Sequence, residues 1–285
     1  MTDTSSTAAG EGTTAARAPR AGRNLPVAIA VGLGLLALVA VSLAFRPELF
    51  VLLATVAVGA ALWELAQAFR RRDLHLPLLP LLVGTVGILV SSYYSGPEAL
   101  LVSFMLTVAG AVVWRVIDGS GTAAVRDAAA ATFAAAYLPF MAGFVMLMLA
   151  APDGRVRVLL FILLAVANDV GGYVAGVLFG RHPRAPSLPP KTPWAGHGGS
   201  VVLPTAVGVV GAVVGLGASP LLGVALGVLA PLTATIGDLA ESMIKRDLEL
   251  KDMGSLLPGH GGILDRLDSM LLTAPFVYVL LALAV

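Results

Sequence analysis

Long apolar segments recur along most of the 285-residue chain, and short polar stretches separate them. Each segment is close to the roughly 20 residues that an α-helix needs to cross a hydrocarbon core about 30 Å thick. Backbone groups inside a bilayer must pair with one another, so these segments are predicted to be helices. The expected spans are 25–45, 48–69, 76–95, 98–117, 128–150, 156–178, 200–217, 220–238 and 269–285. The pattern predicts an all-α, polytopic integral membrane protein with about nine transmembrane helices.

The polar stretches also indicate how the chain is organised. Residues 1–24 are rich in Thr, Ala, Gly and Ser, which predicts a disordered cytoplasmic tail. The apolar run that follows is long enough to span a membrane, so it is expected to be retained rather than cleaved as a signal peptide. We expect N-terminal transmembrane helices in 25–150 and a C-terminal transmembrane catalytic region in 151–285. The Gly-Ala-Ser-Pro sequence at 217–220 predicts a tight helical hairpin.

Composition narrows the function classes. Hydrophobic residues make up 58% of the chain and charged residues 12%, against about 25% charged in a typical soluble domain. A simple soluble enzyme, a disordered protein and a nucleic-acid-binding protein with a basic face are therefore excluded. The chain has no cysteine, which excludes disulfides, thiolate nucleophiles and cysteine-based metal sites.

The positions of Lys and Arg predict the orientation. With the N-terminus in the cytoplasm, 15 of the 18 Lys and Arg residues lie on the cytoplasmic side, and the other three are Arg46, Arg155 and Arg157. This split follows the positive-inside tendency. We therefore expect a multi-pass protein of the cell (inner) membrane, with its active site on the cytoplasmic face.

Two cytoplasmic connections, 180–199 and 238–268, interrupt the apolar pattern, and the second holds 7 of the 17 acidic residues. Its first residues place Asp238, Glu241, Ser242 and Lys245 on one helical face at i, i+3, i+4 and i+7. The plain alternative is a solvated helix end with a Glu241–Lys245 ion pair. Because Asp238 lies at the rim of an apolar run, where ionisable groups are costly and usually functional, we favour a functional site.

Other carboxylates fit the same interpretation. Asp265 and Asp268 are spaced i, i+3 at the start of the last helix, where they could complement the helix dipole or bind Mg²⁺. Asp169 is also a poor choice for packing alone, near the cytoplasmic end of the sixth span. We expect Glu64, in contrast, to pair with a nearby arginine or to extend to the interface, and His260 taken alone is more easily explained as structural.

Cations and glycines lie between these acids. Lys245, Arg246 and Lys251 could neutralise phosphate charge, and the glycines at 254, 259, 261 and 262 could let backbone N–H groups approach an anion. Lys191 could reach a phosphate or be a solvated loop lysine. Carboxylates, cations and glycines together at a membrane surface indicate metal-dependent phosphoryl or nucleotidyl chemistry.

Residues 242–268 read SMIKRDLELKDMGSLLPGHGGILDRLD. This segment resembles the signature of the phosphatidate cytidylyltransferase (CDP-diacylglycerol synthase) family, which begins with S-x-apolar-K-R, continues through K-D and H-G-G, and closes with D-R-apolar-D. The residues just before it are similar to the family's G-D-x-x-E-S sequence. Two positions depart from the family pattern: Ala195 stands where the family has Glu, and Gly172 where it has Ala.

The resemblance implies the reaction of CTP with phosphatidic acid to give CDP-diacylglycerol and pyrophosphate. It implies Mg²⁺, with a second cation left open, held by Asp238 and Asp265 with Asp268 and Asp169 as outer partners. The implied catalytic residues are Asp238, Ser242, Lys245, Arg246, Asp265 and Arg266. The implied substrate-binding residues are Lys191, Lys251, His260, Gly261 and Gly262. The expected partners are CTP, phosphatidic acid and the lipid bilayer, with no nucleic acid and with a homodimer left open.

Other function classes remain as alternatives. A membrane transporter could use Asp169 and Asp238 in an ion path, although the motif residues gather on one face. A CTP-dependent polyprenol kinase would transfer the γ-phosphoryl group and release CDP. The D-G-x-x-A-R…G…D…D pattern of CDP-alcohol phosphotransferases is not found in the chain.

Overall fold

The computed structural model describes residues 25–119, 121–179, 194–257 and 261–285, and these residues are almost entirely helical. The predicted tail at 1–24, Lys191 and His260 lie outside the described residues. The helical elements are α1 (Leu25–Phe45), α2 (Pro47–Arg70), α3 (Leu78–Asp118), α4 (Thr122–Ala135), the π-helix η1 (Ala136–Phe140), α5 (Met141–Ala150), α6 (Gly154–Phe179), α7 (Trp194–Val210), the π-helix η2 (Gly211–Gly215), α8 (Pro220–Asp247) and α9 (Leu264–Ala284). The predicted all-α class is confirmed.

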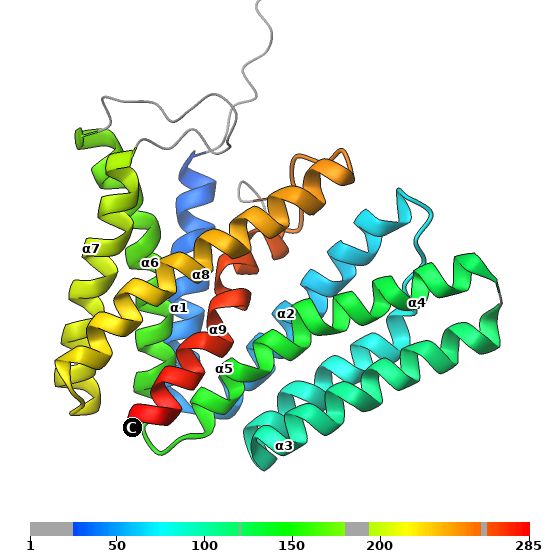
Figure 1. Ribbon diagram of the computed structural model, residues 1–285, viewed down its shortest axis with the longest axis horizontal. Helices are drawn as coiled ribbons and strands as arrows, with labels where there is room; N and C mark the ends of the chain where they lie inside the picture. The colour runs from blue at the N-terminus through cyan, green and yellow to red at the C-terminus, as the bar shows by residue number, and fades with distance from the viewer. Residues whose placement is uncertain (1–24, 120, 180–193, 258–260) are drawn as a thin grey trace, which may run out of the picture.

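The helix α3 folds back on itself at Gly96. This residue has φ 83°, a left-handed conformation that glycine adopts without steric cost. The two arms then lie side by side in opposite directions, as Figure 1 shows, and Ser91 donates a hydrogen bond to Ser103 across the turn at 3.0 Å. The hairpin thus contains two of the predicted spans, 76–95 and 98–117.

Within the described residues, 7 helical segments are long and apolar enough to cross a membrane, and α1 adds a shorter apolar stretch. When the two arms of α3 are counted separately, the described chain has nine apolar helical segments, in agreement with the predicted count. Their outward surfaces carry large exposed apolar side chains, such as Val214 (81%) and Leu283 (82%). Apolar surface of this extent suits contact with lipid, and the chain is therefore a multi-pass membrane protein.

Small residues bring the C-terminal helices into close contact. Figure 1 shows α6 and α7 side by side, with α8 and α9 crossing next to them. A Cβ at Gly199 of α7 would overlap the carbonyl oxygen of Gly171 on α6, and a Cβ at Gly223 of α8 would overlap the backbone of α7 near Gly208. Such close backbone approach is typical of helix packing in membranes.

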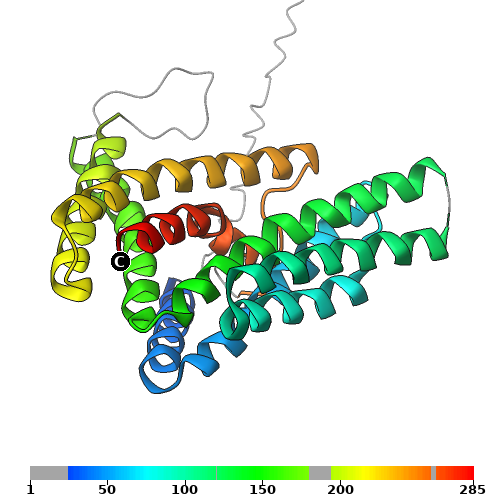
Figure 2. The ribbon, with the colours of Figure 1, turned by 60° about the horizontal axis from the view of Figure 1, so that its bottom comes forward.

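Two helices extend beyond their predicted ends. The spans predicted at 220–238 and 269–285 belong to helices that run from Pro220 to Asp247 and from Leu264 to Ala284. Figure 2 shows α8 crossing over α9, with the segment after α8 turning back toward the start of α9. The polar residues of 238–268 therefore lie partly on two packed helix ends, where the charged side chains can pair with one another.

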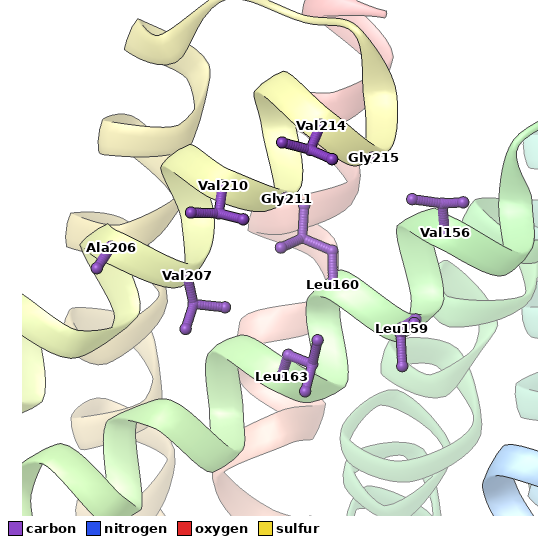
Figure 3. Close-up of a pocket in the computed structure, with 10 residues that line it drawn as sticks. All are labelled: Val156, Leu159, Leu160, Leu163, Ala206, Val207, Val210, Gly211, Val214 and Gly215. Atoms are coloured by element: carbon purple, nitrogen blue, oxygen red, sulfur yellow. The ribbon is translucent and has the colours of Figure 1, made fainter.

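An apolar cavity of about 450 Å³ lies between the first part of α6 and the last part of α7 with η2. Figure 3 shows Leu160 of α6 pointing toward Gly211, between other aliphatic side chains. Val156 and Gly215, at the ends of α6 and η2 away from Asp169, also line this cavity. Its lining contains no charged or polar side chain, so this cavity suits contact with apolar groups such as lipid chains and offers no group for catalysis.

The contact between α6 and α7 can be tested by substitution. We expect Gly199→Val to lower the free energy of unfolding of the purified protein by at least about 1–3 kcal/mol, because the valine side chain would overlap Gly171 and Ala175. Gly198→Val is the matched control, since a Cβ there meets no atom within 4 Å. Thermal unfolding in detergent measures both variants, and equal loss of stability would contradict the packing described.

Candidate active site

The Lys245 ammonium joins the ends of α8 and α9. Its Nζ lies 2.8 Å from Oε2 of Glu241 on the same helix and 2.6 Å from Oδ1 of Asp265 on α9. The Glu241 side chain is only 2% exposed and that of Asp265 only 4%. The predicted alternative of a solvated helix end is therefore wrong, although its Glu241–Lys245 pair is present.

Asp265 also organises the connection from α8 to α9, residues 248–263, which we call the motif loop. Its carboxylate accepts hydrogen bonds from the backbone N–H of Gly262 at 2.8 Å and of Met253 at 3.2 Å. The residue lies in the first turn of α9, where a negative charge is favoured by the helix dipole. The buried Asp265 carboxylate thus connects Lys245 to the motif loop at two points, Met253 and Gly262.

Three further acids, on α6, α8 and α9, lie within electrostatic range of one another. Gly237 allows α8 to approach α9 closely, because a Cβ there would lie 2.7 Å from the carbonyl oxygen of Asp268. The carboxylate of the adjacent Asp238 interacts electrostatically with those of Asp268 and of Asp169 on α6. Together with Glu241 and Asp265, these residues form the acid cluster.

The acid cluster has more negative charge than its described cations balance. Of the five carboxylates in the acid cluster, Lys245 pairs with two, and Arg266 interacts with a third, that of Asp169. The second oxygen of Glu241, Oε1, is buried and has no hydrogen-bond partner among the described residues, and the Asp268 carboxylate also interacts with Glu241. Carboxylate oxygens with an excess of negative charge are suited to a hard divalent cation.

The same residues do not already form a complete metal-ligand set. In the described ranges, no three His, Asp or Glu side chains stand together as metal ligands. A Mg²⁺ ion usually keeps several water or substrate oxygens and needs only one or two protein carboxylates. The acid cluster therefore fits Mg²⁺ in charge and ligand type.

The other predicted site residues are placed around the acid cluster. Ser242 is partly buried on α8, whereas Arg246 and Lys251 are exposed at the end of that helix and in the motif loop. Arg266 is exposed on α9, beside Asp265. Arg246 and Lys251 thus place exposed positive charge at the rim of an acidic site, where it attracts anions.

The motif loop is closed by its own backbone. Leu257 and Gly261 exchange two hydrogen bonds of 2.9 and 3.2 Å, and Gly261 has φ 86°, which favours glycine. Gly262 lies against the Asp265 carboxylate, as its 2.8 Å hydrogen bond shows. We predicted that glycine N–H groups of this segment approach an anion. In the structure, the N–H of Gly262 approaches a carboxylate of the protein itself, that of Asp265.

Glu64 of α2 holds the motif loop from the opposite side. Its Oε2 accepts from the N–H of Leu264 at 3.0 Å and its Oε1 from that of Leu256 at 3.4 Å. The residue is 1% exposed, and a Cβ at Gly254 would overlap its carboxylate. The expectation that Glu64 extends to the interface or pairs with an arginine is wrong, because its described partners are backbone N–H groups.

The sequence placed Glu241 on the functional face of the helix without giving it a role, and it did not assign Glu64 to the site. The signal for Glu64 is an ionisable residue within an apolar run, which is costly unless a specific partner compensates it. The partner was not recognisable, because it lies about 190 residues further along the chain. Glu241 carries a clearer signal, since it precedes Lys245 by one helical turn.

The anchoring role of Glu64 can be tested directly. Glu64→Gln replaces one carboxylate oxygen by an amide NH₂, so the N–H of either Leu256 or Leu264 loses its acceptor at a local cost of about 1–3 kcal/mol. We expect faster amide hydrogen exchange in residues 253–264 of the purified protein, measured by mass spectrometry.

Asp127→Asn is the control for this exchange experiment. Asp127 is also a buried carboxylate, but it accepts from the N–H of His75 at 2.9 Å and pairs with Arg115 at 2.7 Å. Its substitution should accelerate exchange near His75 and leave the motif loop unchanged. Unchanged loop exchange in Glu64→Gln would show that Glu64 does not hold the loop.

The chain is similar to known proteins over nearly its whole length. The model of the cytidylyltransferase family matches residues 26–284. The chain is 38% identical over 280 residues to the phosphatidate cytidylyltransferase of Mycobacterium leprae, covering 93% of this chain and 90% of that protein. It is 37% identical over 277 residues to the enzyme of the same name from Mycobacterium bovis, with 93% and 90% covered. This chain belongs to the cytidylyltransferase family.

Proposed function

We propose that this chain transfers the cytidylyl group of CTP to phosphatidic acid, giving CDP-diacylglycerol and pyrophosphate. A phosphate oxygen of phosphatidic acid attacks the α-phosphorus of CTP. The bond from this phosphorus to the bridging oxygen breaks, and pyrophosphate leaves with the electron pair. The observation that carries the proposal is the acid cluster of α6, α8 and α9, in which Lys245 pairs with Glu241 and Asp265, in a chain of this family.

An apolar cavity beside the acid cluster supports a lipid substrate. This cavity of about 450 Å³ lies between α1, α2, α5, α6 and α9. Leu267, which lines it, directly precedes Asp268, and Val166 lines it one helical turn before Asp169. A polar headgroup at the acid cluster would therefore have apolar space beside it for part of an acyl chain.

The described residues have distinct roles in this proposal. Asp238 and Asp268, with Glu241 and Asp169 beside them, would hold Mg²⁺, which supplies charge stabilisation of the phosphates when bound. Lys245 has three N–H donors, of which Glu241 and Asp265 engage two, so one remains for a phosphate oxygen. These residues act by positioning the two phosphates and balancing their charge, and no protein nucleophile is needed.

The proposed reaction also fits the position of the acid cluster along the helices. Asp265 lies in the first turn of α9, and Asp238 and Asp169 lie nine and ten residues before the ends of α8 and α6, in the halves of these helices that lead to the long polar connections. We propose that these ends face the cytoplasm at the inner membrane, because 15 of the 18 Lys and Arg residues then lie on that side. A lipid phosphate in the headgroup plane could meet cytosolic CTP there.

Position-specific labelling tests the reaction. Purified protein, phosphatidic acid, Mg²⁺ and CTP labelled at the α-phosphate should give a labelled lipid, whereas CTP labelled at the γ-phosphate should give labelled pyrophosphate. Label from the γ-phosphate in a lipid would instead support a CTP-dependent kinase. Uptake of a labelled solute into vesicles with no lipid product would support a transporter.

The role of Asp238 is tested by Asp238→Asn. This variant removes a carboxylate that is repelled by its neighbours, so stability should be unchanged or higher. If Asp238 holds Mg²⁺, kcat should fall about 100-fold or more, because charge stabilisation of this kind is worth several kcal/mol. Steady-state kinetics and thermal unfolding measure the two effects.

Glu249→Gln serves as the control, since Glu249 is an exposed acid at the start of the motif loop that pairs only with Arg72 among its described neighbours. Its kcat should stay close to that of the wild type. Wild-type kcat in Asp238→Asn, with Mg²⁺ as the sole divalent ion, would remove Asp238 from the proposed metal site.

A further inference from the structure

Tyr137 presents a buried hydroxyl that has no hydrogen-bond partner among the described residues. The residue is 7% exposed and belongs to the π-helix η1, Ala136–Phe140, between α4 and α5. Buried polar groups are nearly always paired, so an unpaired hydroxyl requires a reason. π-Helical turns are also found frequently at functional sites.

The hydroxyl lies within electrostatic range of the acid cluster. It interacts electrostatically with Glu241, Asp268 and Asp238, which belong to α8 and α9. Glu241 contributes the other buried side-chain oxygen of this region that lacks a described partner. The Tyr137 hydroxyl, which can donate a hydrogen bond, and Oε1 of Glu241, which can accept one, are thus within electrostatic range of each other but do not pair.

The ring of Tyr137 is held in this orientation by aromatic packing. It stacks on Phe133, one helical turn earlier, with ring centroids 5.4 Å apart and planes at 13°. Phe133 in turn contacts Phe69 of α2 at 6.4 Å. Because this packing restricts the ring, the hydroxyl stays on the side of the acids and cannot turn toward another acceptor.

We propose that the Tyr137 hydroxyl binds substrate by donating a hydrogen bond to an oxygen of a phosphate held at the acid cluster. The inference rests on the proposed function, and it adds a residue from η1 to those of α6, α8 and α9. A neutral phenol is suited to this place, because it donates to an oxygen anion without adding a cation that would compete with Mg²⁺ for the carboxylates. Either the triphosphate of CTP or the lipid phosphate could supply the oxygen.

The test is Tyr137→Phe, which removes only the hydroxyl and keeps the stacked ring. We expect kcat/KM to fall about 10-fold to 100-fold, as for loss of one hydrogen bond to a charged group. A higher KM for CTP alone would assign the bond to the triphosphate, and a higher KM for phosphatidic acid alone would assign it to the lipid. Tm should stay unchanged or rise, because an unpaired buried hydroxyl is lost.

Tyr278→Phe is the matched control. Tyr278 is a partly buried tyrosine of α9 whose ring contacts Phe144 at 5.6 Å. Its variant should retain wild-type kcat and KM for both substrates. Wild-type kinetics in Tyr137→Phe, or a drop in Tm that accompanies the loss of activity, would overturn the proposal, since the latter pattern indicates a structural hydroxyl.

A binding measurement separates this inference from the proposed function. Adding CTP or inorganic pyrophosphate with Mg²⁺ should raise the Tm of the wild type more than that of Tyr137→Phe. If the wild type makes no nucleotide-bearing lipid but this difference is present, the proposed function fails and the role of Tyr137 stands. If the wild type is active and the two proteins respond equally in Tm and kinetics, the role of Tyr137 fails alone.

Discussion

The bridge from Lys245 to Glu241 and Asp265 is the interaction on which the site depends. Both carboxylates are almost fully buried, and a buried charge without a partner is strongly destabilising. The same Asp265 fixes the backbone of the motif loop at Met253 and Gly262. One ammonium group therefore connects α8 to α9 and, through Asp265, to the loop between them.

The helix packing serves to bring charges from distant segments to one end of the bundle. Gly237 permits the contact of α8 with α9 that places Asp238 near Asp268. Gly171 and Gly199 hold α6 against α7, and α6 carries Asp169. Because apolar side chains cover the rest of these helices, the polar end borders directly on apolar surface, as an enzyme acting on an amphiphile requires.

The helices and the motif could be predicted from sequence, whereas the supports of the motif could not. Apolar length alone located nine spans, because a bilayer leaves the backbone few alternatives to a helix. Clustered charges at helical spacing located Asp238 and Lys245. Glu64 and Tyr137 could not be assigned to the site, because each is a single polar residue in an apolar segment. The groups that Glu64 binds and the acids with which Tyr137 interacts electrostatically lie more than 100 residues away in the sequence. The π-turn that carries Tyr137 also has no apolar periodicity of its own.

The connections at the other end of the bundle are very short. Only Arg46 separates α1 from α2, Gly96 alone turns the chain within α3, and residues 151–153 and 216–219 complete this end. In the orientation proposed above, these connections would be the translocated ones, so biogenesis would carry very little polar chain across the bilayer. Each pair of helices that they join could enter the lipid as a hairpin, and the longer connections between described helices would stay on the side where the chain is synthesised.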